Sequence, residues 1–147
     1  MNSGASTLTM QNDGNLVLYR PDGSSAWASN TNHSVGSSVN ASYTLYSNWR
    51  LKSADSRMEA VMQQDGNFVV YWDSSPLWST GTWGSGSNRV VMQSDGNLVV
   101  YDANNVAHWA SGTNGSGGSV LSMQNDGNLV IKTSGGAVVW ASNTGGH

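Results

Sequence analysis

Polar side chains of four types recur along the chain at a fixed spacing that suits hydrogen bonding to a hydroxyl-rich ligand. The spacing is Gln-x-Asp-x-Asn-x-Val-x-Tyr. The carboxylate accepts hydrogen bonds, while the amides and the phenol both donate and accept them. Adjacent sugar hydroxyls do the same, and they lie beside C–H groups that the valine could touch. Three copies are complete, and we number the candidate sites in chain order: Gln11, Asp13, Asn15, Val17 and Tyr19; Gln63, Asp65, Asn67, Val69 and Tyr71; Gln93, Asp95, Asn97, Val99 and Tyr101.

A fourth copy of the pattern lacks the phenol. It keeps Gln124, Asp126, Asn128 and Val130, but Lys132 stands where the other copies have Tyr. We therefore expect this fourth site to be weak or silent.

Each copy surrounds an Asp-Gly pair flanked by alternating residues, which is a strong signal for a β-hairpin. A two-residue turn at this pair would mix polar and apolar side chains on one face. A three-residue loop over residues 12–14, with its Gly in the left-handed region, instead pairs Met10 with Leu16. Gln11 then pairs with Asn15, and the polar set shares the face opposite the apolar one. The same loop predicts the pairs Met62–Phe68, Met92–Leu98 and Met123–Leu129.

A tryptophan follows each hairpin at a near-constant offset and opens a third strand. These residues are Trp27, Trp78, Trp109 and Trp140. A large aromatic at one place in every repeat predicts that the rings meet near a common axis. Trp49, Trp72 and Trp83 lie outside the repeat pattern, and any of them could line a sugar subsite or an interface.

The repeats are unevenly spaced, which predicts the domain organisation. We expect an extra repeat at 1–33, a linker or poorly specified strand at 34–43, and a domain of three repeats at 44–147. A lone three-stranded unit would be marginally stable in water. We therefore expect the first repeat to dock against a neighbouring chain and to help build a homodimer.

Composition excludes several classes of partner. Charged residues are 10 % of the chain and the net charge is −3, which argues against nucleic acid and anionic membranes as partners. The chain has no cysteine, which excludes disulfides and thiolate metal sites. No stretch is apolar enough to insert into a membrane, and the N-terminus lacks the segments of a signal peptide. A mature secreted protein and a cytoplasmic protein both fit.

The repeated pattern resembles the sugar-binding motif of the bulb-type, or monocot mannose-binding, lectin family, and the strands Trp-Ala-Ser-Asn-Thr resemble the same family. The resemblance implies an all-β fold, the β-prism II, with three antiparallel four-stranded sheets around a pseudo-threefold axis. It implies multivalent binding of mannose-rich glycans or glycoproteins, without a cofactor. It also implies that Asp and Asn hold the axial O2 of mannose, Gln reaches O3, Tyr reaches O4, and Val contacts the ring.

Other functions fit the residues less well. A glycosidase needs two carboxylates that flank one bond, whereas each repeat has one at its turn. His33, His108 and His147 share no repeat position and have no nucleophile beside them. The loop 12–15 has the oxygens of a calcium site but lacks the downstream bidentate Glu. We therefore expect no enzyme and no metal, and the open alternative is a structural repeat that binds no sugar.

Overall fold

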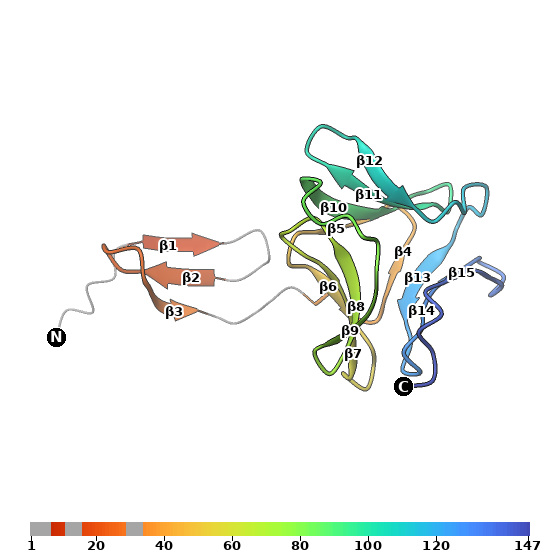
Figure 1. Ribbon diagram of the computed structural model, residues 1–147, viewed down its shortest axis with the longest axis horizontal. Coiled ribbons are helices and arrows are strands. Elements are labelled where there is room, and N and C mark those ends of the chain that lie inside the picture. Colours follow the sequence, from red (N-terminus) through yellow and green to blue (C-terminus); the bar gives the residue numbers. More distant parts are fainter. Residues whose placement is uncertain (1–6, 11–15, 29–33) are drawn as a thin grey trace. The chain divides into compact units, whose positions relative to one another are not determined.

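The computed structural model describes residues 7–10, 16–28 and 34–147, with strands joined by short turns (Figure 1). The chain divides into two compact units, Met1–His33 and Ser34–His147. Among the described residues, no helix is long and apolar enough to span a bilayer.

The described part of the first unit is one antiparallel sheet. Its strands are β1 (Thr7–Met10), β2 (Leu16–Tyr19) and β3 (Ser25–Ala28), in the order β1-β2-β3. The register pairs Met10 with Leu16, as the three-residue loop predicts. Gln11, Asp13 and Asn15 of the first site lie outside the described residues, while Val17 and Tyr19 lie on β2, where Tyr19 is half-buried.

Residues 34–147 form three antiparallel sheets of four strands each. The sheet of the second site is β6 (Arg50–Lys52), β7 (Met58–Met62), β8 (Phe68–Trp72) and β9 (Ser75–Ser79), in that order. The sheet of the third site has the order β12 (Ala107–Ala110), β11 (Leu98–Asp102), β10 (Ser87–Met92) and β5 (Tyr43–Tyr46). The sheet of the fourth site has the order β15 (Val138–Ala141), β14 (Leu129–Lys132), β13 (Val120–Met123) and β4 (Ser38–Asn40). The three sheets face one another around a common centre (Figure 1), which confirms the expected β-prism II.

Residues 38–52 supply the fourth strand of all three sheets. β4 pairs with β13, β5 pairs with β10, and β6 pairs with β7. Of these strands only β6 joins the hairpin that directly follows it, so the chain crosses from sheet to sheet before the repeats begin. Main-chain hydrogen bonds therefore tie this one segment to every repeat of the second unit.

The linker expected at 34–43 is wrong for Ser38–Asn40, which form β4. Val39 is only 6 % exposed and belongs to the hydrophobic core. The other interpretation of this range, a poorly specified strand, is correct for these residues. The flanking Ser and Gly residues carry no alternating pattern, so the burial of Val39 against the other sheets, and not local propensity, makes the strand.

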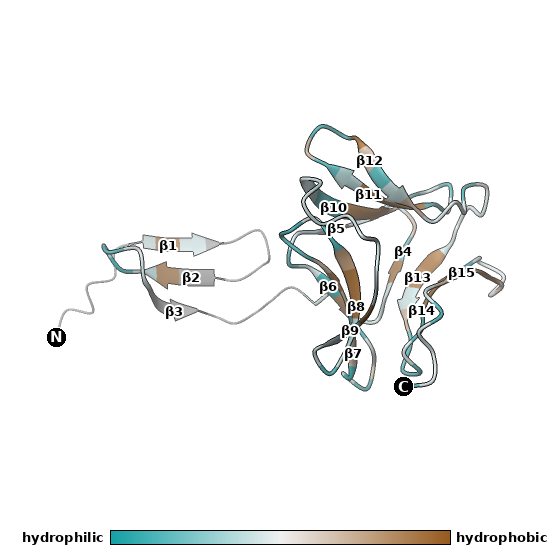
Figure 2. Cartoon of the chain, viewed as in Figure 1, coloured by the Kyte–Doolittle hydropathy of each residue, from teal (hydrophilic) through white to brown (hydrophobic). Residues whose placement is uncertain are grey.

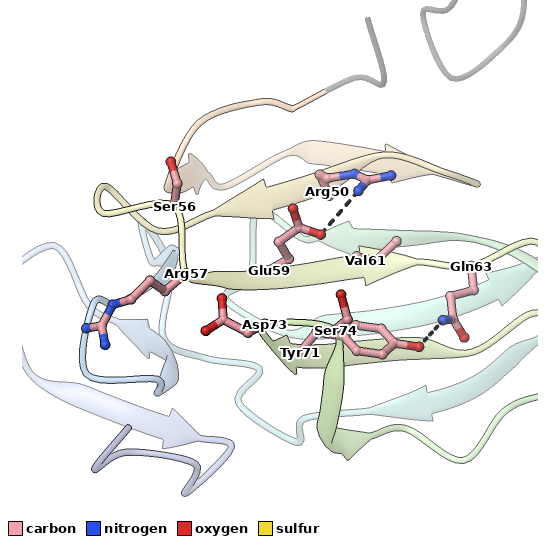
Figure 3. Close-up of a pocket in the computed structure, with 9 residues that line it drawn as sticks. All are labelled: Arg50, Ser56, Arg57, Glu59, Val61, Gln63, Tyr71, Asp73 and Ser74. Carbon is pink, nitrogen blue, oxygen red and sulfur yellow. Dashed lines mark hydrogen bonds and ion pairs between the residues drawn. The ribbon is translucent and has the colours of Figure 1, made fainter. Parts of the chain in front are cut away.

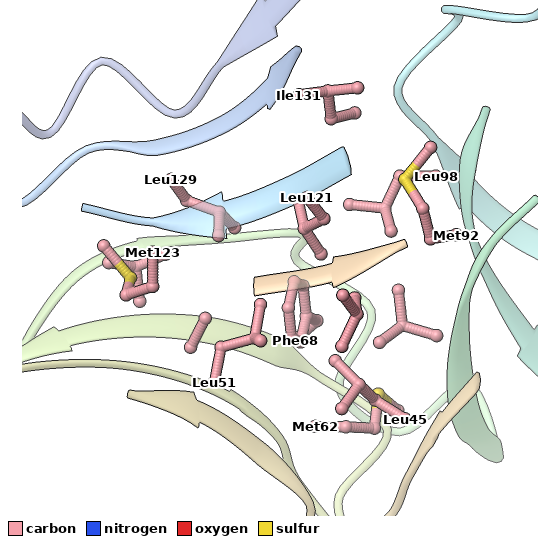
Figure 4. Close-up of a cluster of buried hydrophobic side chains, with 14 of the residues drawn as sticks. Leu45, Leu51, Met62, Phe68, Met92, Leu98, Leu121, Met123, Leu129 and Ile131 are labelled. Atoms are coloured by element: carbon pink, nitrogen blue, oxygen red, sulfur yellow. The ribbon is translucent and has the colours of Figure 1, made fainter. Parts of the chain in front are cut away.

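The inner faces of the sheets build one apolar core. Along β7, Met58, Ala60 and Met62 are fully buried, while Glu59 and Val61 alternate with them on the outer face. The hydrophobic residues concentrate on strands such as β8 and β10 (Figure 2). The predicted pairs Met62–Phe68, Met92–Leu98 and Met123–Leu129 are all present and buried (Figure 4). The three-residue loop and the assignment of faces are thus confirmed in all three sheets.

The repeat tryptophans of the second unit meet in a triangle. The ring centroids are 5.6 Å apart for Trp78 and Trp109, 5.3 Å for Trp78 and Trp140, and 5.7 Å for Trp109 and Trp140. All three contacts are edge-to-face, the arrangement that aromatic quadrupoles favour. This confirms that these rings gather near a common axis, with one ring from each sheet.

Candidate functional site

The turn of each candidate site in residues 34–147 is held in one conformation by its glycine. In the second site, Gly66 has φ +92° and donates its N–H to the Gln63 carbonyl at 3.2 Å, while Gln63 donates its own N–H to the Asn67 carbonyl at 2.8 Å. A Cβ at Gly66 would come within 3.0 Å of the Thr82 carbonyl oxygen. Only glycine accepts this backbone without strain, so the turn places the Asp and the Asn at the same end of the outer face.

Each turn aspartate of residues 34–147 uses one carboxylate oxygen for the protein and leaves the other available. Oδ1 of Asp65 accepts the N–H of Asn67 at 2.9 Å, and Asp95 and Asp126 make the same bond to the Asn two residues later, also at 2.9 Å. This is an Asx-turn. These three carboxylates are exposed, and no hydrogen bond of a described residue reaches their Oδ2 atoms, which can therefore accept one from a ligand.

The asparagine amides are oriented by the strand that follows the tryptophan. Asn67 is 9 % exposed, and its Oδ1 accepts hydrogen bonds from the Thr80 hydroxyl at 3.1 Å and the Thr82 N–H at 3.2 Å. In the third site, Asn97 Oδ1 accepts from the Ser111 hydroxyl at 3.0 Å and the Thr113 N–H at 3.2 Å. Because the oxygen is held by the protein, the Nδ2 group is left to donate to a ligand.

The Ser and Thr residues that hold Asn67 and Asn97 were missed as site residues from the sequence. Their signal was present, because a Ser or Thr two residues after the repeat tryptophan and a Thr four residues after it recur with each polar pattern. Thr82 also donates its hydroxyl to the Gly66 carbonyl at 2.6 Å. The recurring strand is therefore needed to position the site as well as to carry the central tryptophan.

The glutamine and tyrosine of each complete described site are hydrogen-bonded to each other. Gln63 Nε2 donates to the Tyr71 hydroxyl at 2.5 Å, and Gln93 Nε2 donates to the Tyr101 hydroxyl at 2.6 Å. Because the hydroxyl accepts this bond, its own proton can be donated to a ligand. A β-bulge beside Tyr71 and Tyr101 shifts the register with the tryptophan strand, and such bulges re-aim side chains.

The motif valines are more buried than the sequence suggests. Val69, Val99 and Val130 are 3 %, 3 % and 2 % exposed although they lie on the outer faces. Val69 pairs with Val61, and the bond between Gln63 and Tyr71 spans this pair. Val61 is half-buried and lines the hollow beside the site, so it has more surface for an apolar ligand contact than Val69.

A hollow of about 450 Å³ continues from the second site along its sheet (Figure 3). Gln63 and Tyr71 lie toward one end, and Ser56 and Arg57 lie toward the other. The lining residues are Arg50, Ser56, Arg57, Glu59, Val61, Gln63, Tyr71, Asp73 and Ser74. The charges of the lining arginines are partly neutralised by two ion pairs, Arg50 with Glu59 at 3.1 Å and Arg57 with Asp55 at 2.8 Å. The hollow therefore offers a polar surface with charges of both signs.

The third site has a different neighbourhood. Arg89 stands across the hairpin from Tyr101, where the second site has Glu59 across from Tyr71. The Arg89 guanidinium lies 5.2 Å from the Tyr101 ring centroid and donates to the Asp102 carbonyl at 2.7 Å. A separate hollow of about 420 Å³ is lined by Ser42, Val91, Gln93, Ser94 and Asp95.

The fourth site keeps the half of the arrangement formed by its Asp and Asn. Asn128 Oδ1 accepts from the Ser142 hydroxyl at 3.2 Å and from the Thr144 N–H at 3.4 Å, as in the other sites. Lys132 stands across from Val120 at the tyrosine position. The turn geometry at Asp126 thus survives in a site whose phenol is missing.

His108 is hydrogen-bonded to an aspartate that does not belong to a motif turn. His108 Nε2 lies 3.0 Å from Asp102 Oδ2, and this hydrogen bond lowers the pKa of the Asp102 carboxyl. Asp102 ends β11 and His108 lies on β12, and both are away from the turn that carries Asp95. No group of three or more His, Asp or Glu side chains in the described part of the chain could hold a metal ion.

Comparison with solved structures finds chains that are similar to this one in sequence and fold. A lectin from Japanese Marasmius oreades is 36 % identical with a TM-score of 0.72, covering 76 % of this chain and 95 % of that one. A monomeric monocot mannose-binding lectin from Gastrodia elata is 36 % identical with a TM-score of 0.68, covering 74 % and 98 %. The mannose-specific agglutinin of snowdrop (Galanthus nivalis), solved with methyl-α-D-mannoside, is 36 % identical with a TM-score of 0.62, covering 74 % and 96 %. No family model and no curated protein matches the chain.

Proposed function

Since the chain belongs to the bulb-type mannose-binding lectin family, we propose that it is a multivalent lectin that binds mannose and mannose-rich glycans. The observation that carries the proposal is the common set of available groups on the outer faces of the second and third sites. Each has a free carboxylate oxygen, an amide nitrogen and a tyrosine hydroxyl, held by equivalent hydrogen bonds.

The binding chemistry follows from which atoms the protein has already used. The Asp Oδ2 accepts from an axial hydroxyl and the Asn Nδ2 donates to the same oxygen, while the tyrosine hydroxyl donates to a second sugar oxygen. The glutamine, already bonded to the tyrosine, keeps its Oε1 for a third hydroxyl. A glucose has an equatorial O2 and would leave the Asp and Asn groups unsatisfied, so the site favours mannose.

One such site binds weakly. Four hydrogen bonds that each contribute about 1 kcal/mol net correspond to a dissociation constant on the order of 1 mM. Three complete copies of the motif per chain raise the avidity for clustered glycans by roughly 10²-fold or more where the spacing of the sites matches the glycan. The apolar contact with the sugar ring falls to Val61 in the second site, because Val69 is almost fully covered.

The same geometry favours binding over catalysis. Each described hairpin of the second unit carries a single carboxylate at its turn, in Asp65, Asp95 and Asp126. Glycoside hydrolysis needs two carboxyl groups on either side of one bond. We therefore propose a lectin without enzymatic activity.

We also propose that the N-terminal repeat docks on a second copy of the chain and helps to form a homodimer. A three-stranded sheet is marginally stable in isolation, and Leu8 on β1 is 60 % exposed. A chain that starts at Ser34 retains β4 and thus the whole second unit. It should run as a smaller oligomer than the intact chain on light scattering, and an unchanged oligomer would contradict the proposal.

The function is tested by calorimetric titration with methyl α-mannoside and, in parallel, methyl α-glucoside. We expect weak heat with the mannoside only, and about three sites per chain. The variant Asp65→Asn, Asp95→Asn keeps the oxygen that the Asx-turn needs and removes the acceptor, so it should lose two sites. Asp126→Asn in the incomplete fourth site is the matched control and should change nothing. Equal heat with both sugars, or none with either, would favour the structural repeat.

A further inference from the structure

An exposed tryptophan stands at the turn of the second site and at no equivalent place in the two other sheets of residues 34–147. Trp83 is 67 % exposed. A single exposed aromatic is common on protein surfaces and by itself indicates nothing. What makes Trp83 informative is its position relative to Asp65, which the repeat geometry defines.

The equivalence between repeats rests on one shared hydrogen bond. The residue after Trp83 donates its N–H to the carbonyl of the turn Asp, and so do the equivalent residues of the other repeats. The bonds are Gly84 to Asp65, Gly115 to Asp95 and Gly146 to Asp126, all at 2.8 Å. Trp83 therefore corresponds to Asn114 in the third repeat and to Gly145 in the fourth.

The glycine at this position shows where a side chain would begin. A Cβ placed on Gly145 would lie 3.8 Å from Asp126 Oδ2 and 3.7 Å from the Asn128 Cβ. This Oδ2 is the carboxylate oxygen that the Asx-turn leaves available. By the shared turn geometry, the Trp83 side chain starts beside the equivalent groups of the second site, Asp65 and Asn67.

The direction of the indole is given by a second contact. A Cβ placed on Gly81 would lie 3.6 Å from Trp83 Cζ3, so the six-membered ring lies over Gly81. The segment beneath it includes Thr82, whose N–H holds Asn67 Oδ1. The indole thus forms a wall at the turn end of the second site, whereas the hollow lined by Val61 and Tyr71 continues from the opposite end.

We propose that Trp83 is the platform of a second sugar subsite, on which the hexose linked to the bound mannose packs its C–H face. This rests on the function proposed above. An indole offers a large apolar face for such a ring together with one N–H donor. The third site has the whole polar set with Asn114 in place of the indole, so the first mannose does not require it. The second site is therefore an oligosaccharide site, and the third site, with Asn114 at this position, lacks the second subsite.

The test isolates the second site in the intact chain. A background with Asp13→Asn and Asp95→Asn leaves one complete motif. It is titrated with methyl α-mannoside and with methyl α-dimannosides of the 1,2, 1,3, 1,4 and 1,6 linkages. Adding Trp83→Asn, which installs the residue of the third site, should lower the affinity for at least one dimannoside about tenfold relative to that for the monosaccharide.

The reciprocal variant is the matched control. Asn114→Trp, in a background with Asp13→Asn and Asp65→Asn, should raise the preference of the third site for the same dimannoside. Tryptophan emission should also change on dimannoside binding in the isolated second site, and this change should disappear with Trp83→Asn. All variants are first compared by thermal unfolding.

Three results would overturn the proposal. One is an unchanged affinity ratio for all four linkages with Trp83→Asn. Another is an equal loss of monosaccharide and dimannoside binding, which would place the indole in the first subsite. The third is a change in oligomeric state without a change in the ratio, which would make Trp83 an interface residue. Absence of mannoside binding in the background without any Trp83 change would instead refute the proposed function, so the two failures are distinguishable.

Discussion

The inner and outer faces of the same three sheets differ in how strictly the repeat is kept. On the inner faces the pair next to each turn is Met with Phe or Leu in all three sheets, and one tryptophan per sheet completes the central triangle. On the outer faces, the residue across the hairpin from the tyrosine position is Glu59, Arg89 or Val120. The residue beside the turn carboxylate is Trp83, Asn114 or Gly145.

The difference follows from what each face contacts. An inner residue packs against the other two sheets at close-packed density, so a change in one repeat requires compensation in the others. An outer residue contacts solvent or a ligand of its own site, so each repeat can change alone. Three nearly identical cores can therefore carry three different sites.

The sharpest test of this comparison is Trp109→Ala at the axis. Removing one ring breaks two edge-to-face contacts, with Trp78 and Trp140, and should lower the free energy of unfolding by about 3–5 kcal/mol. Trp83→Ala on the outer rim should change it by less than about 0.5 kcal/mol. Urea unfolding of both variants provides the measurement. Similar losses for the two would mean that the faces do not differ as described.

A second test concerns Asn67, whose Oδ1 is held by the protein and whose Nδ2 is left to donate to the ligand. Asn67→Ala should cost about 1–3 kcal/mol of stability, because the Thr80 hydroxyl and the Thr82 N–H lose their acceptor. Asn67→Asp keeps that acceptor and removes the amide donor, so it should abolish binding at the second site with a smaller loss of stability. Thermal unfolding and mannoside titration of the two variants separate the roles. A normal melting temperature for Asn67→Ala would contradict the assigned hydrogen bonds.

A third test asks whether an outer face can be rebuilt alone. Lys132→Tyr places a phenol beside Gln124 on a hairpin that already holds Asp126 and Asn128 as in the other sites. Titration should then show one more mannose per chain, and Lys132→Phe, without the hydroxyl, should not add it. If the stoichiometry stays the same, the defect lies in neighbours such as Val120.

The smallest expected effect concerns Asp55, whose backbone contacts a residue in the hairpin of another sheet. The Asp55 N–H donates to Asn125 Oδ1 at 3.1 Å. Hydrogen bonds from the Ser53 hydroxyl and then from Arg57 lower the pKa of the Asp55 carboxyl to about 2. Since the folded pKa lies below the unfolded value near 3.8, the carboxylate stabilises the fold above that pH, and the contribution is lost as the pH falls toward 2.

The measurement for Asp55 is the melting temperature between pH 5 and pH 2. Asp55→Asn should make the decline over this range less steep and should have a smaller effect at pH 2 than at pH 5. Asp22, whose pKa is also lowered, lies in the first unit and provides the matched control as Asp22→Asn. An unchanged slope for Asp55→Asn would exclude this carboxyl from the acid dependence.

The local sequence pattern was sufficient to predict the hairpins and the face on which each of their side chains lies. The two-residue period of a strand and the Asp-Gly turn place Met62 opposite Phe68 and send Gln63 to the other face, whatever the rest of the chain does. The recurrence of Trp78, Trp109 and Trp140 was sufficient to predict that their rings meet. Turn chemistry and side-chain alternation act over a few residues, so the sequence carries them directly.

Long-range packing determined the features that the local pattern does not predict. Which sheet β4, β5 and β6 would join depends on edges that exist only after the three hairpins come together, and the burial of Val39 depends on the same event. The structural use of Asn67 Oδ1 comes from residues brought back by the Trp78 strand. The position of Trp83 beside Asp65 arises in the same way. These features depend on contacts between distant residues, and a pattern of local spacing contains no information about them.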